Sequence, residues 1–229
     1  MECRIGVSKK FSESISRIPE HLDAGSRNNC EVSQRNTDGI KNAIRNKYAE
    51  VSLSARGKFQ YPTGMDGARA LGYAPAILAS AHPMLLESFC GVGNPFSLGS
   101  IRSGQAVLDY GCGAGFDLFV ASKLVGRNGR VCGIDLTAPM VEKAKENLAR
   151  AGVSTIEVVA VDSEMIPYKD GAFDIVISNG VINLCPDKPA CLKEIYRVLK
   201  WGGRLQIADV VLEHELPAAL ADSPEAWSQ

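Results

Sequence analysis

The sequence has no surplus of charge of either sign. Its 25 lysine and arginine residues nearly balance 26 aspartate and glutamate residues, which gives a net charge of −1. A chain without a basic excess is not expected to bind nucleic acid or an anionic membrane surface by general attraction. No apolar run approaches the length of about 18 residues that a membrane-spanning helix needs, and the N-terminus has no apolar signal segment. We therefore predict a cytoplasmic protein whose partners include neither nucleic acid nor membrane.

The sequence also lacks the cysteine spacing of a disulfide framework or a zinc site. It has seven cysteines, an odd number, and no C-x-x-C pair. Cys112 lies in a glycine-rich segment and Cys132 in a predicted core strand. This usage is typical of reduced thiols in a cytosolic protein. We predict no bound metal ion.

The most informative stretch runs from residue 106 to 117 and reads A-V-L-D-Y-G-C-G-A-G-F-D. An apolar run ends at Asp109, and Gly111, Gly113 and Gly115 then alternate with other residues. The segment that follows has apolar residues at helical spacing, which predicts a helix directly after the glycines. Strand, glycine turn and helix together bring a ligand against bare backbone at a helix N-terminus.

Two acids indicate which ligand this turn receives. Asp109 lies two residues before the first glycine, where it would repel a pyrophosphate and attract a cation. Asp135 ends the next apolar run, about 20 residues past the turn, the distance at which a carboxylate accepts the hydroxyls of a ribose. The spacing G-x-G-x-G also differs from the dinucleotide pattern. We predict S-adenosylmethionine (SAM), with Asp109 near its amino-acid end and Asp135 on its ribose. The alternative is a structural turn with two incidental acids.

Strands and helices alternate along residues 104–212. The pattern predicts helices at 116–125, 138–151 and 187–200, and strands at 105–109, 130–134, 156–160, 173–177 and 204–211. The second helix has Thr137 as its cap, and Gly202-Gly203 is expected to end the third. Such alternation predicts an α/β fold: a Rossmann-like, doubly wound and mostly parallel sheet with helices on both faces.

The N-terminal region is predicted to be an extension of this core. Residues 1–36 are expected to be a polar, mobile tail, with a linker at 25–29. A helix is predicted from Thr37, since apolar residues recur at helical spacing up to Val51. Residues 37–103 would form a helical cap with loops, in which 87–98 is an ordered segment that either lines a site or connects to the first strand. Residues 213–229 would be a short tail.

Polar residues also follow the later strands. Asp162 and Ser163 end the third strand, where an acid or amide receives the adenine amino group. Asn179 lies in the loop after the fourth strand, which is expected to face the transferred methyl group. Each residue could instead satisfy only nearby backbone.

Four segments together resemble the class I SAM-dependent methyltransferases over about residues 104–212. They read V-L-D-Y-G-C-G-A-G, G-I-D-L-T-A-P-M, F-D-I-V-I-S-N and V-L-K-W-G-G-R-L. With I-S-N-G-V-I-N-L-C-P-D-K and the upstream L-G-Y and G-N-P, the chain is more closely similar to the arsenite methyltransferases, over about residues 44–212. Those enzymes methylate trivalent arsenic that cysteine thiolates hold. The resemblance implies SAM as donor and S-adenosyl-L-homocysteine (SAH) as product.

The resemblance implies a set of cofactor contacts, among them a tyrosine that closes over SAM. In this sequence they fall on Tyr48, Asp109, Gly111, Cys112, Gly113, Gly115, Asp135, Leu136, Met140, Asp162, Ser163 and Asn179.

This chain departs from the family at the acceptor cysteines. Gly180 and Val92 stand where the family usually has cysteine, and Tyr61-Pro-Thr-Gly64 replaces an N-terminal pair. A further family cysteine lies in a C-terminal region, and this chain stops at Gln229. Cys90 and Cys185 are the remaining candidates for acceptor-site thiols; Cys191 is expected to be buried one turn into a helix.

The sequence offers no strong general base. His82 and His214 are each expected at the surface. This favours a soft acceptor, such as a thiol or a thiolate-bound metalloid, that loses no proton in the transition state. Two alternatives stay open: a small-molecule C- or O-methyltransferase of the ubiquinone/menaquinone type, and a truncated SAM-binding module without turnover.

Overall fold

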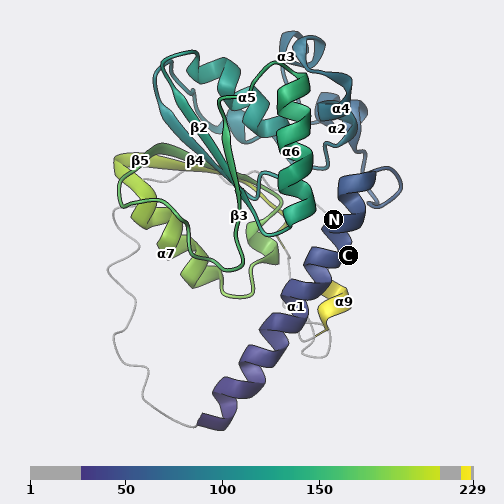
Figure 1. The fold of residues 1–229 in the computed structure, drawn as a ribbon, viewed down its shortest axis with the longest axis vertical. Helices are drawn as coiled ribbons and strands as arrows, with labels where there is room; N and C mark the ends of the chain where they lie inside the picture. Colours follow the sequence, from purple (N-terminus) through teal and green to yellow (C-terminus); the bar gives the residue numbers. More distant parts are fainter. Residues whose placement is uncertain (1–26, 212–222, 228–229) are drawn as a thin grey trace.

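A five-stranded parallel sheet forms the centre of the molecule (Figure 1). The computed structural model describes residues 27–211 and 223–227. All strand pairs are parallel, in the order β3-β2-β1-β4-β5. The strands are β1 Ala106–Tyr110, β2 Arg130–Asp135, β3 Glu157–Ala160, β4 Phe173–Asn179 and β5 Leu199–Ala208. The predicted α/β class is confirmed.

Helices cover both faces of this sheet because the strand residues alternate between two apolar clusters. Val107 and Ile175 pack in one cluster with α5 (Phe116–Val125) and α6 (Ala138–Arg150). Leu108 and Val176, their chain neighbours, pack in the other with α7 (Lys188–Val198). A sheet buried on both sides in this way needs apolar residues at nearly every strand position. The strand order reverses between β1 and β4, and parallel sheets bind ligands at the carboxyl ends of such strands.

The N-terminal region is helical and begins earlier than predicted. The helix α1 runs Arg27–Leu53, so Thr37 and Asp38 lie inside it and neither one starts it. No proline interrupts residues 27–38, so nothing in the sequence ends the helix there. Shorter helices follow in this region: α2 Gly64–Ala70, α3 Pro75–Ser80, α4 Pro83–Glu87 and the 3-10 turn η2 Pro95–Leu98. The predicted tail at 1–26 lies outside the described residues.

The junction between α7 and β5 also differs from the prediction. The helix ends at Val198 and the strand starts at once with Leu199. The strand pairing passes from Phe173–Leu199 to Ile175–Arg204, so β5 carries extra residues at this point. Gly202-Gly203 therefore belongs to an irregular stretch of the strand rather than to a helix end, a common use of glycine in strands. The fifth strand ends at Ala208, three residues before the predicted end, and β4 continues to Asn179; the remaining core boundaries agree within two residues.

The short helix α9 (Pro224–Trp227) packs on α1 (Figure 1). A Cβ added at Gly39 of α1 would lie 3.6 Å from Cγ of Pro224. The Lys188 amine lies 4.6 Å from the centre of the Trp227 ring, so α9 touches the start of α7 as well. Trp201, in contrast, is fully exposed on β5.

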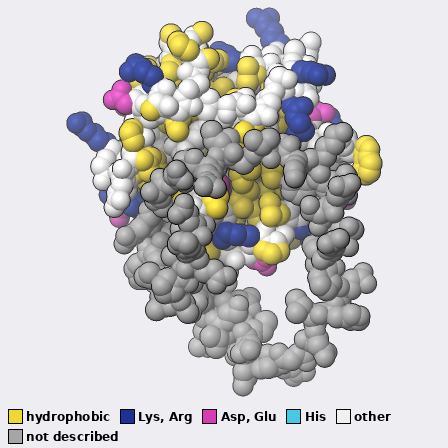
Figure 2. All heavy atoms as spheres, turned by 180° about the vertical axis from the view of Figure 1, so that it is seen from behind, with side chains coloured by type: hydrophobic (Ala, Val, Ile, Leu, Met, Phe, Trp, Pro, Cys, Tyr) yellow, Lys and Arg dark blue, Asp and Glu magenta, His cyan; other side chains and the backbone are white. Residues whose placement is uncertain are grey.

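Basic side chains stand apart from one another on the face that Figure 2 shows, rather than gathered in one patch. Among the described helices, none is both long and apolar enough to cross a bilayer.

Candidate active site

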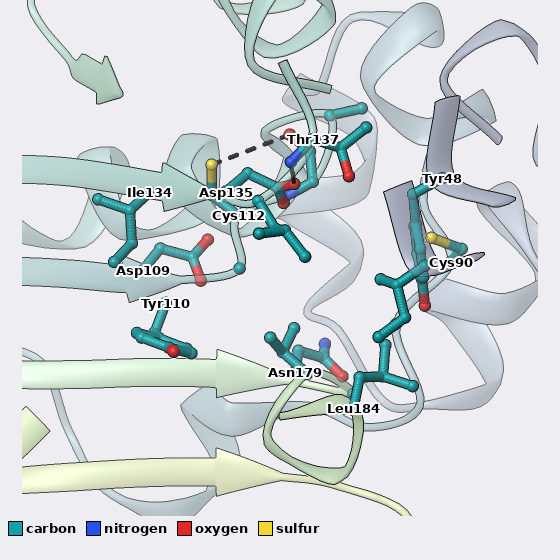
Figure 3. A pocket seen from close by; sticks show the side chains of 18 of the residues that line it. Tyr48, Cys90, Asp109, Tyr110, Cys112, Ile134, Asp135, Thr137, Asn179 and Leu184 are labelled. Atoms are coloured by element: carbon teal, nitrogen blue, oxygen red, sulfur yellow. Dashed lines mark hydrogen bonds between the residues drawn. The ribbon is translucent and has the colours of Figure 1, made fainter. Parts of the chain in front are cut away.

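A cavity opens at the carboxyl ends of β1, β2 and β4 (Figure 3). It encloses about 1090 Å³ between atoms, part of it open to solvent. Its wall combines the glycine turn and strand ends of the core with α1, residues 88–91 and residues 179–186. Segments that lie far apart in the sequence therefore meet at the point where the strand order reverses.

Two glycines of the turn have different physical reasons to be glycine. Gly111 has a φ of 78°, and a Cβ there would overlap the Val181 side chain. Gly113 has a φ of 50°, and a Cβ there would have no atom within 4 Å. The backbone at Gly113 is thus bare on the side of the cavity it lines, as close approach of a ligand requires. The predicted residue Gly115 starts α5 but does not line the cavity.

Asp135 joins the glycine turn to the start of α6. One carboxylate oxygen accepts the N–H of Gly113 at 2.8 Å, and the other accepts the N–H of Thr137 at 2.8 Å. Burial raises the pKa of this carboxyl, and the two backbone donors oppose the rise. A carboxylate oxygen can accept more than one hydrogen bond. Asp135 is therefore held in place with lone pairs left for ligand hydroxyls.

Asp109 lines the same cavity and is only 2% exposed. Within the described residues its Oδ2 atom has no hydrogen-bond partner. Burial raises the pKa of Asp109 well above the usual range, and the neighbouring charges of Asp117 and Asp135 raise it further. A buried carboxylate without a partner is costly in free energy. This residue is suited to receive a positively charged donor.

Asp117, at the start of α5, was missed by the sequence analysis. It accepts hydrogen bonds from the hydroxyl of Tyr73 at 2.7 Å and from the amide of Asn179 at 3.0 Å. Burial raises its pKa to about 6, against the effect of those two donors. The available signal was an acid on the first turn of a mostly apolar helix. A cationic ligand would stabilise the charged forms of Asp109, Asp117 and Asp135, so the cavity favours a cation over an anion.

Asn179, predicted to face the cofactor, holds a loop. Its side-chain oxygen accepts the N–H groups of Val92 and Gly93 at 2.9 and 3.1 Å, and its amide donates to the carbonyl of Gly93 at 2.9 Å. Asn179 lines the cavity, but its polar atoms are engaged by the loop and by Asp117. It therefore fixes residues 91–93, next to Cys90, against the end of β4.

Helix α1 closes the cavity opposite the sheet. Lys41, Ile44 and Tyr48 line the cavity from three points on α1. The Lys41 amine lies 3.0 Å from the Glu164 carboxylate, and both side chains are mostly buried. Figure 3 shows Tyr48 beside Cys90 on the side away from the strand ends. The role of Tyr48 as a cover over the cofactor stays a prediction.

Of the remaining predicted residues, Leu136 and Ser163 line the cavity, and Met140 and Asp162 do not. Met140 is buried beneath the turn, against Val51 and Ala114. Asp162 lies at the edge, where its backbone carbonyl accepts a hydrogen bond from Arg45 at 3.3 Å. Cys112 lines the cavity with its sulfur 3.9 Å from the carbonyl oxygen of Gly113.

Both predicted acceptor thiols line the cavity, but on different sides. The sulfur of Cys185 is 3.7 Å from the hydroxyl of Tyr110, and Tyr110 and Cys90 lie at opposite sides of the view in Figure 3. Burial, and then the charges of Asp135 and Asp117, raise the pKa of Cys90 to about 12. The thiol partner of Cys185 is Cys191. The structure thus does not bring Cys90 and Cys185 together as a converging pair.

The two positions at which the resemblance implies cysteine are in contact. A Cβ added at Gly180 would lie 3.3 Å from both methyl carbons of Val92. Two thiols at these positions would converge, and this chain has a hydrogen and an isopropyl group there instead. In the part of the chain that the structure describes, no three histidine, cysteine or acidic side chains are arranged to hold a metal ion.

The comparisons with known proteins agree with this geometry. A family profile described as "Methyltransferase domain" matches residues 101–229. An arsenite methyltransferase of Halobacterium salinarum is 32% identical over 213 residues, which cover 87% of this chain and 54% of that protein.

The chain belongs to the SAM-dependent methyltransferases. The mouse (Mus musculus) arsenite methyltransferase is also 32% identical, over 86% of this chain and 54% of its own length. Among solved structures, CrArsM, an arsenic(III) S-adenosylmethionine methyltransferase from Chlamydomonas reinhardtii, matches with 34% identity and a TM-score of 0.53, over 70% of this chain and 53% of that one. This methyltransferase chain thus spans about half the length of the relatives it matches.

Proposed function

We propose that this chain transfers a methyl group from SAM to a small, soft acceptor, such as thiol-bound trivalent arsenic. The observation that carries the proposal is the buried, partnerless oxygen of Asp109 in a cavity with two more carboxylates. SAM has a sulfonium and an ammonium group and no phosphate. A cavity of this charge favours such a ligand and disfavours a dinucleotide.

Each part of the cofactor has a counterpart in the cavity wall. Asp109 would take the ammonium group, and Asp135 the ribose hydroxyls. The bare backbone at Gly113 allows close approach. Leu136 and Ser163 line the end of the cavity where the adenine would lie, and Tyr48 would cover the cofactor from α1.

SAM supplies a methyl group that is already activated on its sulfonium, so the protein's task is to orient donor and acceptor and to exclude water. The described wall of the cavity includes no histidine. A soft acceptor does not need one, because its lone pair attacks without loss of a proton. Cys185 is the proposed acceptor-side thiol, and Cys90 lines the other side of the same cavity.

Calorimetry with SAM and SAH tests the cofactor assignment. The variant Asp109→Asn keeps the shape of the side chain and removes its charge. We expect SAM affinity to fall about 10- to 100-fold, since a charge-assisted hydrogen bond contributes about 1.5–3 kcal/mol. Asp66→Asn, at an exposed residue of α2, is the matched control. Unchanged SAM binding by the Asp109→Asn variant would refute the assignment.

Transfer of label from SAM to a trivalent arsenical tests the acceptor. The competing candidate is a C-methyltransferase. Val92 and Gly180 are in apolar contact and provide no thiol, which suits a carbon acceptor. The chain is also 41% identical over 119 residues to a ubiquinone/menaquinone biosynthesis C-methyltransferase of Klebsiella pneumoniae. Label in a quinone-precursor phenol and none in the arsenical would favour that candidate. SAM binding without transfer to either acceptor would favour a binding module.

A further inference from the structure

Cys185 lines the cavity, and a second free thiol, Cys191, lies buried behind it. Cys185 follows the 3-10 turn η3 (Ile182–Leu184), and Cys191 lies on the first turn of α7. Both are free cysteines of the same buried cluster as Tyr110. The Tyr110 hydroxyl lies 3.7 Å from the sulfur of Cys185, and each of the two thiols shifts the pKa of the other, as neighbouring thiols do.

The segment between the two cysteines is held rigidly. The Asp187 carboxylate accepts the N–H of Ala190 at 2.9 Å, and the Asp187 carbonyl accepts the N–H of Cys191 at 3.0 Å. The Lys188 amine donates to the carbonyl of Cys185 at 3.1 Å. A ligand that bridges the sulfurs would therefore find them already positioned, which lowers the entropy cost of binding.

Access to the pair is from the cavity. Cys185 and Tyr110 line it, whereas Cys191 lies behind them and is fully buried. A ligand in the cavity thus meets Cys185 first. The hydrogen bond from Cys185 lowers the pKa of Cys191, and the Tyr110 hydroxyl adds to this effect.

We propose that the Cys185–Cys191 pair is a dithiol site for trivalent arsenicals and anchors the acceptor at the cavity wall. Soft thiol ligands select ions and metalloids of this kind. Bonds of about 2.3 Å to one central atom place two sulfurs roughly 3.5 Å apart, so the two thiols of this one cluster would have to close to that separation around the ligand. The anchoring role rests on the proposed function; the dithiol site itself does not.

Binding of phenylarsine oxide illustrates the chemistry. Two As–S bonds form, two S–H bonds and the As–O bond break, and the two protons leave with the oxygen as one water molecule. Arsenic stays trivalent throughout, so no oxidant or reductant takes part.

The test is peptide mapping of the whole, reduced chain after treatment with one equivalent of phenylarsine oxide. Trypsin does not cleave between Lys188 and Pro189, so both cysteines stay in the peptide 170–193, while Cys90 lies in the peptide 70–102. We expect one phenylarsenic group in peptide 170–193, with both thiols protected from alkylation. An adduct on peptide 70–102, or none, would overturn the proposal. This measurement needs no substitution.

Serine variants of the cysteines test the same assignment by their affinity for phenylarsine oxide. Cys185→Ser and Cys191→Ser should each lower the affinity for phenylarsine oxide about 100-fold, because the chelate becomes a single bond. Cys132→Ser, at a buried thiol of β2 that contacts Glu157, is the control. If the Cys191→Ser variant keeps full affinity for phenylarsine oxide and the Cys90→Ser variant loses it, Cys90 and Cys185 bind the arsenic together and the proposal is wrong. Calorimetry with SAM on the same samples distinguishes failure of the dithiol site from failure of the proposed function.

Discussion

The two ends of the cavity are built in different ways. The end proposed to hold the cofactor, here called the cofactor end, consists of the glycine turn, Asp109 and Asp135. These lie at the ends of neighbouring strands of one sheet and within 30 residues of one another along the chain. The end proposed to hold the methyl acceptor, here called the acceptor end, combines the loop at residues 88–93 and the segment 179–191. Its side chains come from distant parts of the sequence and are held by side-chain hydrogen bonds such as those of Asn179.

This difference explains which substitutions each end of the cavity tolerates. Backbone position and strand register fix the cofactor end, so a change there disturbs the fold and the ligand together. Separate side chains set the acceptor end, so its chemistry can change while the sheet stays the same. The Gly180–Val92 contact illustrates this: a site at which the resemblance implies thiols has none, on an otherwise matching scaffold.

The largest expected effect comes from the glycine turn. Gly111→Ala would force a Cβ into Val181 at a positive φ, and we expect the free energy of unfolding to fall by about 3 kcal/mol. Gly113→Ala has open space, so it should cost only ~1 kcal/mol of stability while it reduces SAM affinity. Urea denaturation and calorimetry measure the two effects. Gly104→Ala, which also has a positive φ and open space, controls for the backbone penalty. Equal effects of Gly111→Ala and Gly104→Ala would contradict the packing argument.

A second prediction concerns the pH dependence of stability that Asp117 causes. The folded-state pKa of Asp117 is raised from 3.8 to about 6, so the folded chain binds this proton more tightly than the unfolded chain. Stability is therefore highest below the unfolded pKa and falls as the pH rises through about 6, by ~3 kcal/mol in the absence of ligand. Asp117→Asn should remove that part of the decline. Denaturation of both proteins between pH 4 and pH 7.5 measures it, and parallel curves would rule the explanation out.

The smallest expected effect on the cofactor is at the cover of the cavity. Lys41→Met would leave the mostly buried Glu164 carboxylate without its partner. We expect a several-fold faster release of SAM, together with a loss of stability because the buried charge is no longer paired. Lys145→Met, which breaks an exposed pair on α6, is the matched control. Stopped-flow displacement of SAM measures the rates. Identical release by both variants would show that α1 does not retain the cofactor.

The elements around the glycine turn could be predicted from the sequence far better than the arrangement of the side chains at residues 88–93 and 179–191. Hydrophobic alternation and glycine spacing are local signals, and they located the strands, the turn and both acids that flank it. The pairing of Cys185 with Cys191 depends on how the chain folds between η3 and α7, which no periodicity reveals. Asp117 was missed because its partners, Tyr73 and Asn179, lie 44 and 62 residues away. The start of α1 was misplaced because a polar helix without a stop signal resembles a tail.

The position of Trp227 makes it an intrinsic fluorescence probe. The chain has two tryptophans, and the other, Trp201, is fully exposed to water. Once Trp201 is replaced by phenylalanine, the emission of the chain comes from a ring that rests on Lys188, whose amine is bonded to the carbonyl of Cys185. Occupation of the thiol pair would then be visible as a change in fluorescence, without label or coupled assay.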